Sequence, residues 1–266
     1  MKKVKTIVLR TAGTNCDKET AYAFQQAGSE ADLVHINTLV SGKKKLANYH
    51  ILAIPGGFTY GDDVASGKIL ANELRFKLKG QLSDFVDHGK LVIGICNGFQ
   101  VLVKMGLLPR LSGKKDSPVE STLSLNDCGK FQAKWVHLKR EDETGCVWTV
   151  GLPDIVYVPI AHAEGKFIPR NKSVLDTLKR NEQVVFRYCD SKGERRGFPY
   201  NPNGSVDDIA GITDPTGRIL GMMPHPERHI SYLQHPNWRR LSPNADNMGI
   251  GLKIFKNGVN YVKNHL

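Results

Sequence analysis

The chain has 266 residues, a length that suits one large domain, and we expect residues 1–266 to form a single domain. Hydrophobic residues make up 40% and charged residues 24%, which is typical of a globular protein and excludes a disordered or collagen-like chain. No apolar run is long enough to span a membrane, and the N-terminus lacks the pattern of a secretory signal, so we expect a cytoplasmic protein.

The first half of the sequence alternates expected strands and helices. Strands are expected at 4–9, 31–36, 50–54 and 91–95, and helices at 15–26, 67–77, 82–87 and 97–105. The segment 91–95 is entirely apolar, as a strand covered on both faces should be. This order predicts an α/β fold in which a mostly parallel central sheet has helices on both faces.

The second half of the sequence is expected to add short strands to this fold. We expect them at 131–138, 146–150, 155–158, 183–188, 209–212 and 218–223. A closing helix is predicted over 250–262, where apolar residues recur at helical spacing. The segment 192–205 is rich in glycine, proline, asparagine and charge, which predicts a loop.

The chain carries an excess of positive charge. Its 37 Lys and Arg residues against 26 Asp and Glu residues give a formal net charge of +11. Basic residues cluster at 2–3, 43–45, 114–115, 195–196 and 239–240, which fits either a solvated surface or a docking surface for an acidic partner or an anion. No helix-turn-helix, RRM or KH signature accompanies the charge, so we expect no binding to nucleic acid.

The cysteines raise the question of a nucleophile. Their number is odd and none are spaced as CxxC; they are Cys16, Cys96, Cys128, Cys146 and Cys189. This pattern argues against a disulfide framework and against a structural zinc site, and we expect no metal site.

Cys96 is the strongest candidate nucleophile. It lies in the segment G-I-C-N-G at 94–98, between an expected strand and an expected helix, which is the pattern of a nucleophile elbow. Glycines flank such a turn because side chains there would collide with the strand and the helix. The helix N-terminus favours the thiolate, and the amide of Asn97 points to where an oxyanion would form. An unreactive core cysteine in a glycine-flanked turn is the alternative. Cys16 could also be taken as the nucleophile, but no apolar strand ends in an elbow there, because residues 11–15 are polar and loop-like.

His225 is the best candidate for the general base among the nine histidines. The segment P-H-P-E at 224–227 follows an expected strand, and strand ends are where α/β sheets place their sites. Residues two apart in an extended chain face the same side, so Glu227 could orient the His225 ring. The spacing alone fits equally well a histidine in a proline turn beside a surface glutamate.

Gly57 is a candidate second oxyanion donor. It lies in the segment P-G-G-F at 55–58, after an expected strand, where a plain tight turn is the alternative. The glycines offer no side chain to hold this loop. We therefore expect it to be flexible, so that docking of a partner could order it.

Six segments together resemble the class I glutamine amidotransferases, which use a Cys-His-Glu triad, and among them the glutaminase subunits of phosphoribosylformylglycinamidine synthase. They are G-T-N-C-D at 13–17, P-G-G-F-T-Y-G-D at 55–62, G-I-C-N-G-F-Q at 94–100, N-D-C-G-K-F-Q-A-K-W at 126–135, P-I-A-H-A-E-G-K-F at 159–167 and G-M-M-P-H-P-E-R at 221–228. The elbow and H-P-E are common to several amidotransferases, whereas the segments at 55–62, 161–165 and 222–228 are more specific. The sequence departs from the family pattern at Cys128, Lys134 and 63–68.

The resemblance implies the flavodoxin-like fold of these amidotransferases and hydrolysis of L-glutamine to glutamate and ammonia. It implies that Cys96 forms a thioester, that His225 is the general acid and base, and that Glu227 orients His225. It implies further that the amides of Gly57 and Asn97 hold the oxyanion.

The same resemblance implies a glutamine pocket that includes Gln100, Asn126 and Phe131. His162 and Glu164 share the spacing of the preferred histidine and glutamate, but the family pattern makes them pocket or partner-side residues.

The resemblance also implies that ammonia passes to a separate synthetase subunit of purine biosynthesis, often joined by a small bridging subunit. The sequence contains no G-x-x-x-x-G-K-[ST] loop, so ATP and Mg are expected only in the partner, and no cofactor in this chain. The alternatives are the glutaminase component of GMP or anthranilate synthesis and a non-catalytic amidotransferase-like module. The N-terminal and 161–165 segments argue against the first, and the complete candidate triad argues against the second.

Overall fold

The computed structural model describes residues 3–111, 119–241 and 247–266. Of the basic clusters in the sequence, Lys2, Lys114 and Lys115 lie outside these residues. Within the described part of the chain, no helix combines the length and the apolar character needed to cross a membrane.

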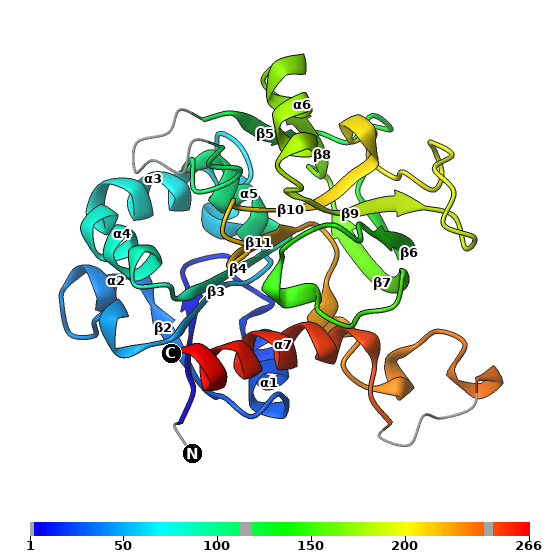
Figure 1. Cartoon of the computed structure of the whole chain (residues 1–266). Helices are drawn as coiled ribbons and strands as arrows, with labels where there is room; N and C mark the ends of the chain where they lie inside the picture. Colours follow the sequence, from blue (N-terminus) through cyan, green and yellow to red (C-terminus); the bar gives the residue numbers. More distant parts are fainter. Residues whose placement is uncertain (1–2, 112–118, 242–246) are drawn as a thin grey trace.

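Nine strands of the described residues form one sheet in the order β2-β1-β3-β4-β11-β10-β9-β6-β7 (Figure 1). Its parallel half contains β1 (Lys5–Arg10), β2 (Glu30–His35), β3 (Ile51–Ile54), β4 (Leu91–Ile95) and β11 (Ile219–Met222). Every residue of β3, β4 and β11 is buried, as parallel strands covered on both faces should be. Met222 pairs with Ile95, so β11 and β4 end side by side.

The second half of the chain extends the sheet with antiparallel strands. These are β6 (Gln132–Arg140), β7 (Ile155–His162), β9 (Val184–Cys189) and β10 (Ile209–Thr213). A separate antiparallel pair joins β5 (Ser121–Ser124) to β8 (Lys166–Pro169). The strand direction therefore changes at β11, which is parallel to β4 and antiparallel to β10.

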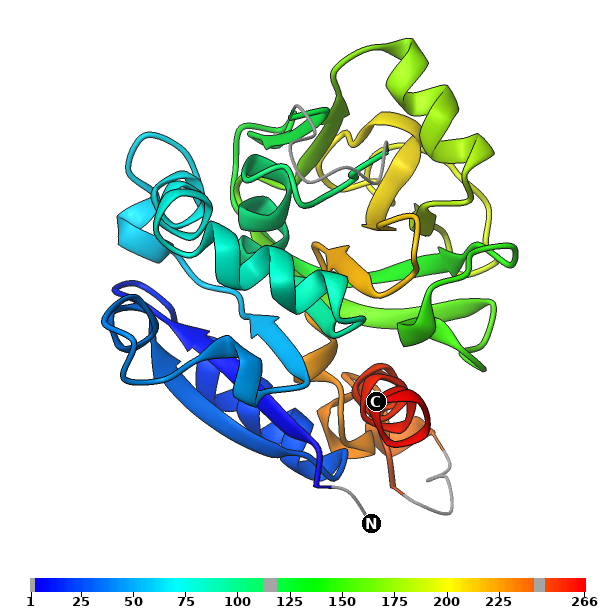
Figure 2. The same ribbon diagram turned by 60° about the vertical axis from the view of Figure 1, so that its left-hand side comes forward.

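Helices cover both faces of the parallel half (Figure 2). On one face α1 (Asp17–Gln26) packs against α7 (Ile250–His265), where the rings of Phe24 and Phe255 meet edge to face at 4.9 Å. On the other face α5 (Asn97–Lys104) packs beside α3 (Lys68–Lys77), which is followed by α4 (Lys79–Asp87). The predicted α/β fold, with a parallel central sheet, helices on both faces and extra strands in the second half, is confirmed.

Some elements differ from the sequence-based expectation. The predicted strand at 146–150 is wrong, because this segment forms the 3₁₀ turn η3 (Val147–Thr149). The Trp148 side chain sets that turn: its Nε1 donates to the Arg218 carbonyl at 3.0 Å, and its ring lies 2.4 Å from where a methyl group on Gly258 would be. The predicted loop at 192–205 is confirmed. Among the α-helices and β-strands of the described residues, four were not expected: α2 (Ile36–Val40), β5, β8 and α6 (Lys172–Arg180).

Candidate active site

Cys96 occupies a sharp turn between β4 and α5, with φ 52° and ψ −106°. A positive φ is unusual for a residue with a side chain, and such strain is typical of a nucleophile elbow. The flanking glycines make the turn possible, because a methyl group on Gly98 would lie 1.8 Å from the Ile54 carbonyl oxygen, and one on Gly94 would lie 2.5 Å from Leu102. The turn predicted around Cys96 is therefore present.

His225 and Glu227 follow β11, the strand that ends beside β4. His225 Nδ1 lies 2.6 Å from Glu227 Oε1, and the two residues are only 2% and 1% exposed, so the alternative of a surface glutamate is wrong. The His225 amide donates to the Pro159 carbonyl at 2.8 Å, which fixes this segment against β7. His225 Nε2 is buried without a hydrogen-bond partner among the described residues.

The charges around His225 favour its protonated form. Burial by itself lowers the pKa of His225, but the negative charges of Glu227 and Cys96 outweigh it and hold this pKa well above its usual value. A protonated His225 would favour the thiolate form of a cysteine close to it. His162 behaves in the opposite way, because burial and the nearby charge of His225 lower the pKa of His162 to about 3.

The two predicted oxyanion donors, Gly57 and Asn97, lie at the ends of β3 and β4. Gly57 follows β3 with φ 147°, and a methyl group there would lie 2.7 Å from the Gly13 carbonyl oxygen. Within the part of the chain that the structure describes, the Gly57 amide makes no backbone hydrogen bond. Asn97 is the first residue of α5, and an amide at that position has no acceptor inside its helix.

The loop after β3 is held by a side chain, so the expectation that nothing holds it is wrong. Thr59 Oγ1 donates to Asn97 Oδ1 at 2.7 Å, and Asn97 Nδ2 donates to Asp62 Oδ1 at 3.1 Å. The Phe58 amide donates to the Gly13 carbonyl at 2.9 Å. The side chain next to the elbow cysteine therefore fastens the loop that carries Gly57.

Gln100 and Asn126, predicted as pocket residues, are buried and bonded within the protein. Gln100 Nε2 donates to the Glu164 carbonyl at 2.5 Å. Asn126 Oδ1 accepts from the Gly165 amide at 3.0 Å and lies 3.2 Å from His162 Nδ1. Both side chains thus hold the segment 162–165, whose neighbour Ala161 accepts a hydrogen bond from Cys96 Sγ at 3.6 Å.

Phe131, the third predicted pocket residue, lies at the surface. Its side chain is 48% exposed, and its ring centroid is 6.3 Å from that of Phe58, which directly follows Gly57. The structure therefore places Phe131 beside the loop that carries one of the oxyanion donors.

Two residues beside His225 were not predicted. Cys16 Sγ lies 4.0 Å from His225 Nδ1, and Arg228 Nη2 donates to Cys16 Sγ at 3.1 Å. Arg228 Nε also donates to Glu19 Oε1 at 2.9 Å. A signal was present in the sequence, since Cys16 and Arg228 belong to the family-like segments at 13–17 and 221–228.

One group of donor atoms has the spacing of a metal site. Within the described residues, atoms of Cys16, His225 and Glu227 lie within 4.8 Å of one another. However, His225 Nδ1 and Glu227 Oε1 are bonded to each other, and the cation of Arg228 already contacts Cys16 Sγ. These partners make the group a poor fit for a metal ion, and the expectation of no metal site stays a prediction.

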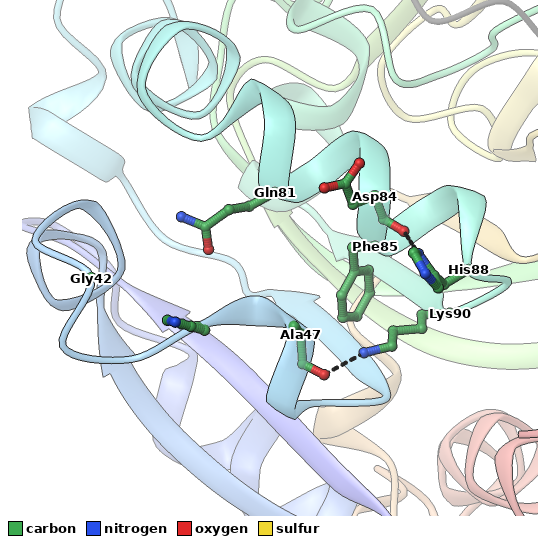
Figure 3. Close-up of a pocket in the computed structure, with 8 residues that line it drawn as sticks. Gly42, Ala47, Gln81, Asp84, Phe85, His88 and Lys90 are labelled. Atoms are coloured by element: carbon green, nitrogen blue, oxygen red, sulfur yellow. Dashed lines mark hydrogen bonds between the residues drawn. The ribbon is translucent and has the colours of Figure 1, made fainter.

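A cavity of about 610 Å³ lies between the segment 42–47 and α4 (Figure 3). There Lys90 Nζ donates to the Ala47 carbonyl at 2.6 Å, below the ring of Phe85. The lining residues are Gly42, Lys45, Ala47, Gln81, Asp84, Phe85, His88 and Lys90. None of the candidate residues described above lines this cavity.

Known proteins resemble the chain over almost its whole length. The family model of the CobB/CobQ-like glutamine amidotransferase domain matches residues 3–262. Phosphoribosylformylglycinamidine synthase subunit PurQ from Dehalococcoides mccartyi is 46% identical, over 99% of each chain, and the same subunit from Methanococcus maripaludis strain C7 is 45% identical, over 97% of each. A chain in the structure of PurLQS from Thermotoga maritima matches with a TM-score of 0.74 and 30% identity, covering 98% of this chain and 100% of that one. The chain is therefore a glutamine amidotransferase, as its sequence motifs predicted, and it belongs to the family of the PurQ subunits of phosphoribosylformylglycinamidine synthase.

Proposed function

We propose that this chain is the glutaminase subunit of phosphoribosylformylglycinamidine synthase and hydrolyses L-glutamine to glutamate and ammonia. The observation that carries the proposal is the strained Cys96 beside the buried His225–Glu227 pair. Membership of the PurQ family supports the choice of glutamine as substrate.

In the proposed reaction the Cys96 thiolate attacks the carboxamide carbon of glutamine. The amides of Gly57 and Asn97 hold the oxyanion of the tetrahedral intermediate. The C–N bond breaks as His225 Nε2 gives its proton to the leaving ammonia, which leaves a thioester on Cys96. His225 then takes a proton from water, and the hydroxide attacks the thioester carbonyl carbon. The C–S bond breaks, glutamate leaves, and the Cys96 thiolate and the protonated His225 are restored. Glu227 keeps Nδ1 hydrogen-bonded throughout, so that Nε2 faces the reacting atoms.

The predicted pocket residues take different parts in this proposal. Gln100 and Asn126 shape the glutamine pocket by fixing the segment 162–165. Phe131 lines its outer rim with Phe58, and both rings are partly exposed.

Ammonia is proposed to pass to a separate synthetase subunit, with a small third subunit bridging the two. One support is the match to a chain of PurLQS from Thermotoga maritima, a name that combines the letters L, Q and S. The other is that the relatives are named as subunits of a synthase. ATP and Mg belong to the synthetase in this proposal, and this chain, acting as one amidotransferase domain over residues 1–266, needs no cofactor. A cytoplasmic location of the complex is part of the same proposal.

The test is ammonia release from glutamine by the purified chain, measured with and without its synthetase subunit. Cys96→Ala should abolish release and keep the fold, and a glutamine-directed alkylating analogue should label Cys96 alone. The matched control is Cys189→Ala, which removes another buried thiol. Label on Cys16 or Cys128, or no ammonia from the complete complex, would reject the proposal.

A further inference from the structure

The N-terminal segment reaches the candidate site through Cys16, which no step of the proposed mechanism uses. Cys16 is 1% exposed, and its thiol donates to Asn15 Oδ1 at 3.0 Å while its sulfur accepts from Arg228 and faces His225 Nδ1. The Cys16 amide donates to the Gly56 carbonyl at 3.2 Å. One residue therefore contacts both the histidine and the loop that carries Gly57.

The space around the His225 ring is filled on this side. A methyl group on Gly56 would lie 2.8 Å from His225 Cε1 and 3.0 Å from Cys16 Sγ. Gly56 and Cys16 therefore pack against the imidazole, whose remaining freedom is limited by the hydrogen bond to Glu227. Protein interiors are closely packed, so removal of the Cys16 sulfur would leave a void beside the imidazole. The ring could then tilt into this void.

Arg228 connects the same pair to helix α1. It is the last residue of the 3₁₀ turn η5 (Pro226–Arg228), which also contains Glu227. Its guanidinium bonds Cys16 at the N-cap of α1 and Glu19 in the first turn of α1. The turn that carries Glu227 is thus fastened to α1 at two points.

We propose that Cys16 and Arg228 are positioning residues that hold the His225–Glu227 pair in a fixed position relative to Cys96. The inference rests on the proposed function and extends the site to the N-terminal helix. Cys16 keeps the imidazole in place by contact, and Arg228 keeps the Glu227 turn in place through its bonds to α1.

A neutral thiol suits this position. Burial raises the pKa of Cys16 to about 11, so it adds no charge beside Glu227 near neutral pH. The charged and titratable groups around His225 are Glu227, Cys96 and Cys16, with Arg228 and His162 further out. None of them needs to change its charge for Cys16 to act by packing.

The first test compares Cys16→Ala with Cys146→Ala. Cys146 is a matched control because it is 2% exposed and burial also raises its pKa to about 11, yet it precedes η3 and not the candidate site. We expect kcat for glutamine hydrolysis to fall roughly 10- to 100-fold in Cys16→Ala, with KM nearly unchanged, and to stay within about twofold in Cys146→Ala. Arg228→Gln should lose more activity than Arg228→Lys, which retains the charge.

The second test needs no turnover. Iodoacetamide labelling of Cys96, followed by peptide mapping across pH, reports how well His225 favours the thiolate. A tilted imidazole stabilises the thiolate less, so the midpoint of labelling should move to higher pH in Cys16→Ala and not in Cys146→Ala. If Cys16→Ala does not fold, Cys16→Ser, which keeps a small polar group there, carries the same test.

A double-mutant cycle decides whether Cys16 acts through the pair. Cys16→Ala should cost much less activity in a Glu227→Gln background than in the wild type, and fully additive losses would overturn the inference. A wild-type labelling profile in Cys16→Ala and Cys16→Ser would also overturn it. If the complete complex releases no ammonia but the labelling midpoint still moves, the proposed function fails and the positioning role stands.

Discussion

His162 should make the fold sensitive to acid. It is 3% exposed, and burial, with a smaller effect from His225, lowers its pKa to about 3 from a usual value of 6.5. Below about pH 6.5 the unfolded chain takes up a proton on this imidazole that the folded chain does not, so acid favours unfolding until the pH approaches the folded value. His162→Gln removes the titrating group but keeps a polar side chain next to Asn126.

The size of this effect follows from the two pKa values. At pH 8 both states carry a neutral imidazole and His162 adds no pH dependence. At pH 5 the unfolded chain is mostly protonated there, and linkage gives a loss of about 2 kcal/mol in the free energy of unfolding. Between pH 8 and pH 5 the wild type should therefore lose about 2 kcal/mol more than His162→Gln.

Urea unfolding, followed by the fluorescence of the three tryptophans, measures this difference at the two pH values. Carboxylates and the other histidines titrate in both proteins, so their contributions cancel in the comparison. His88→Gln, at an exposed position after α4, is the control for loss of a histidine. Equal losses in the wild type and in His162→Gln would refute the argument from burial.

Three further changes test the site. Glu227→Gln should lower kcat by about 10²- to 10⁴-fold without altering the circular dichroism, and wild-type kinetics would contradict its orienting role. Gly98→Ala should lower the free energy of unfolding by about 3 kcal/mol, because the added methyl group would collide with the Ile54 carbonyl. The control is Gly80→Ala on α4, where the methyl group would lie in open space and should have no such effect. Equal urea midpoints for the two variants would contradict this. Phe131→Ala should raise KM for glutamine but leave the urea midpoint unchanged, because the ring is half exposed.

The sequence predicted best what is encoded locally. The elbow at Cys96 needs a glycine on each side, an apolar strand before it and a helix after it, and all of these lie within a short window. The spacing of His225 and Glu227 alone left a surface turn open, and the strand end and the family-like segment at 221–228 favoured the pair. The burial of both residues then excluded the surface turn. The core strands β3 and β4 were found because they are wholly apolar.

Contacts between distant segments could not be predicted in the same way. The approach of Cys16 to His225 depends on α1 and η5 meeting across the fold. The Asn97 side chain holds a loop that looks unrestrained in the sequence. Helix α6 was missed because it is polar, with only Val174 and Leu178 buried. A local signal was the N-cap residue Asn171, whose side chain accepts from the Val174 amide at 3.0 Å.

The position of β11 between β4 and β10 affects when the protein becomes reactive. Cys96 and His225 end neighbouring strands, but the whole antiparallel half of the sheet is synthesised between them. A nascent chain that has emerged only as far as β10 contains the elbow but lacks His225, the proposed base. Bringing β11 back to β4 closes a very long loop, which makes this pairing a late and slow event. Ammonia release would therefore report that β11 has been inserted into the sheet, and chains truncated before β11 would release no ammonia.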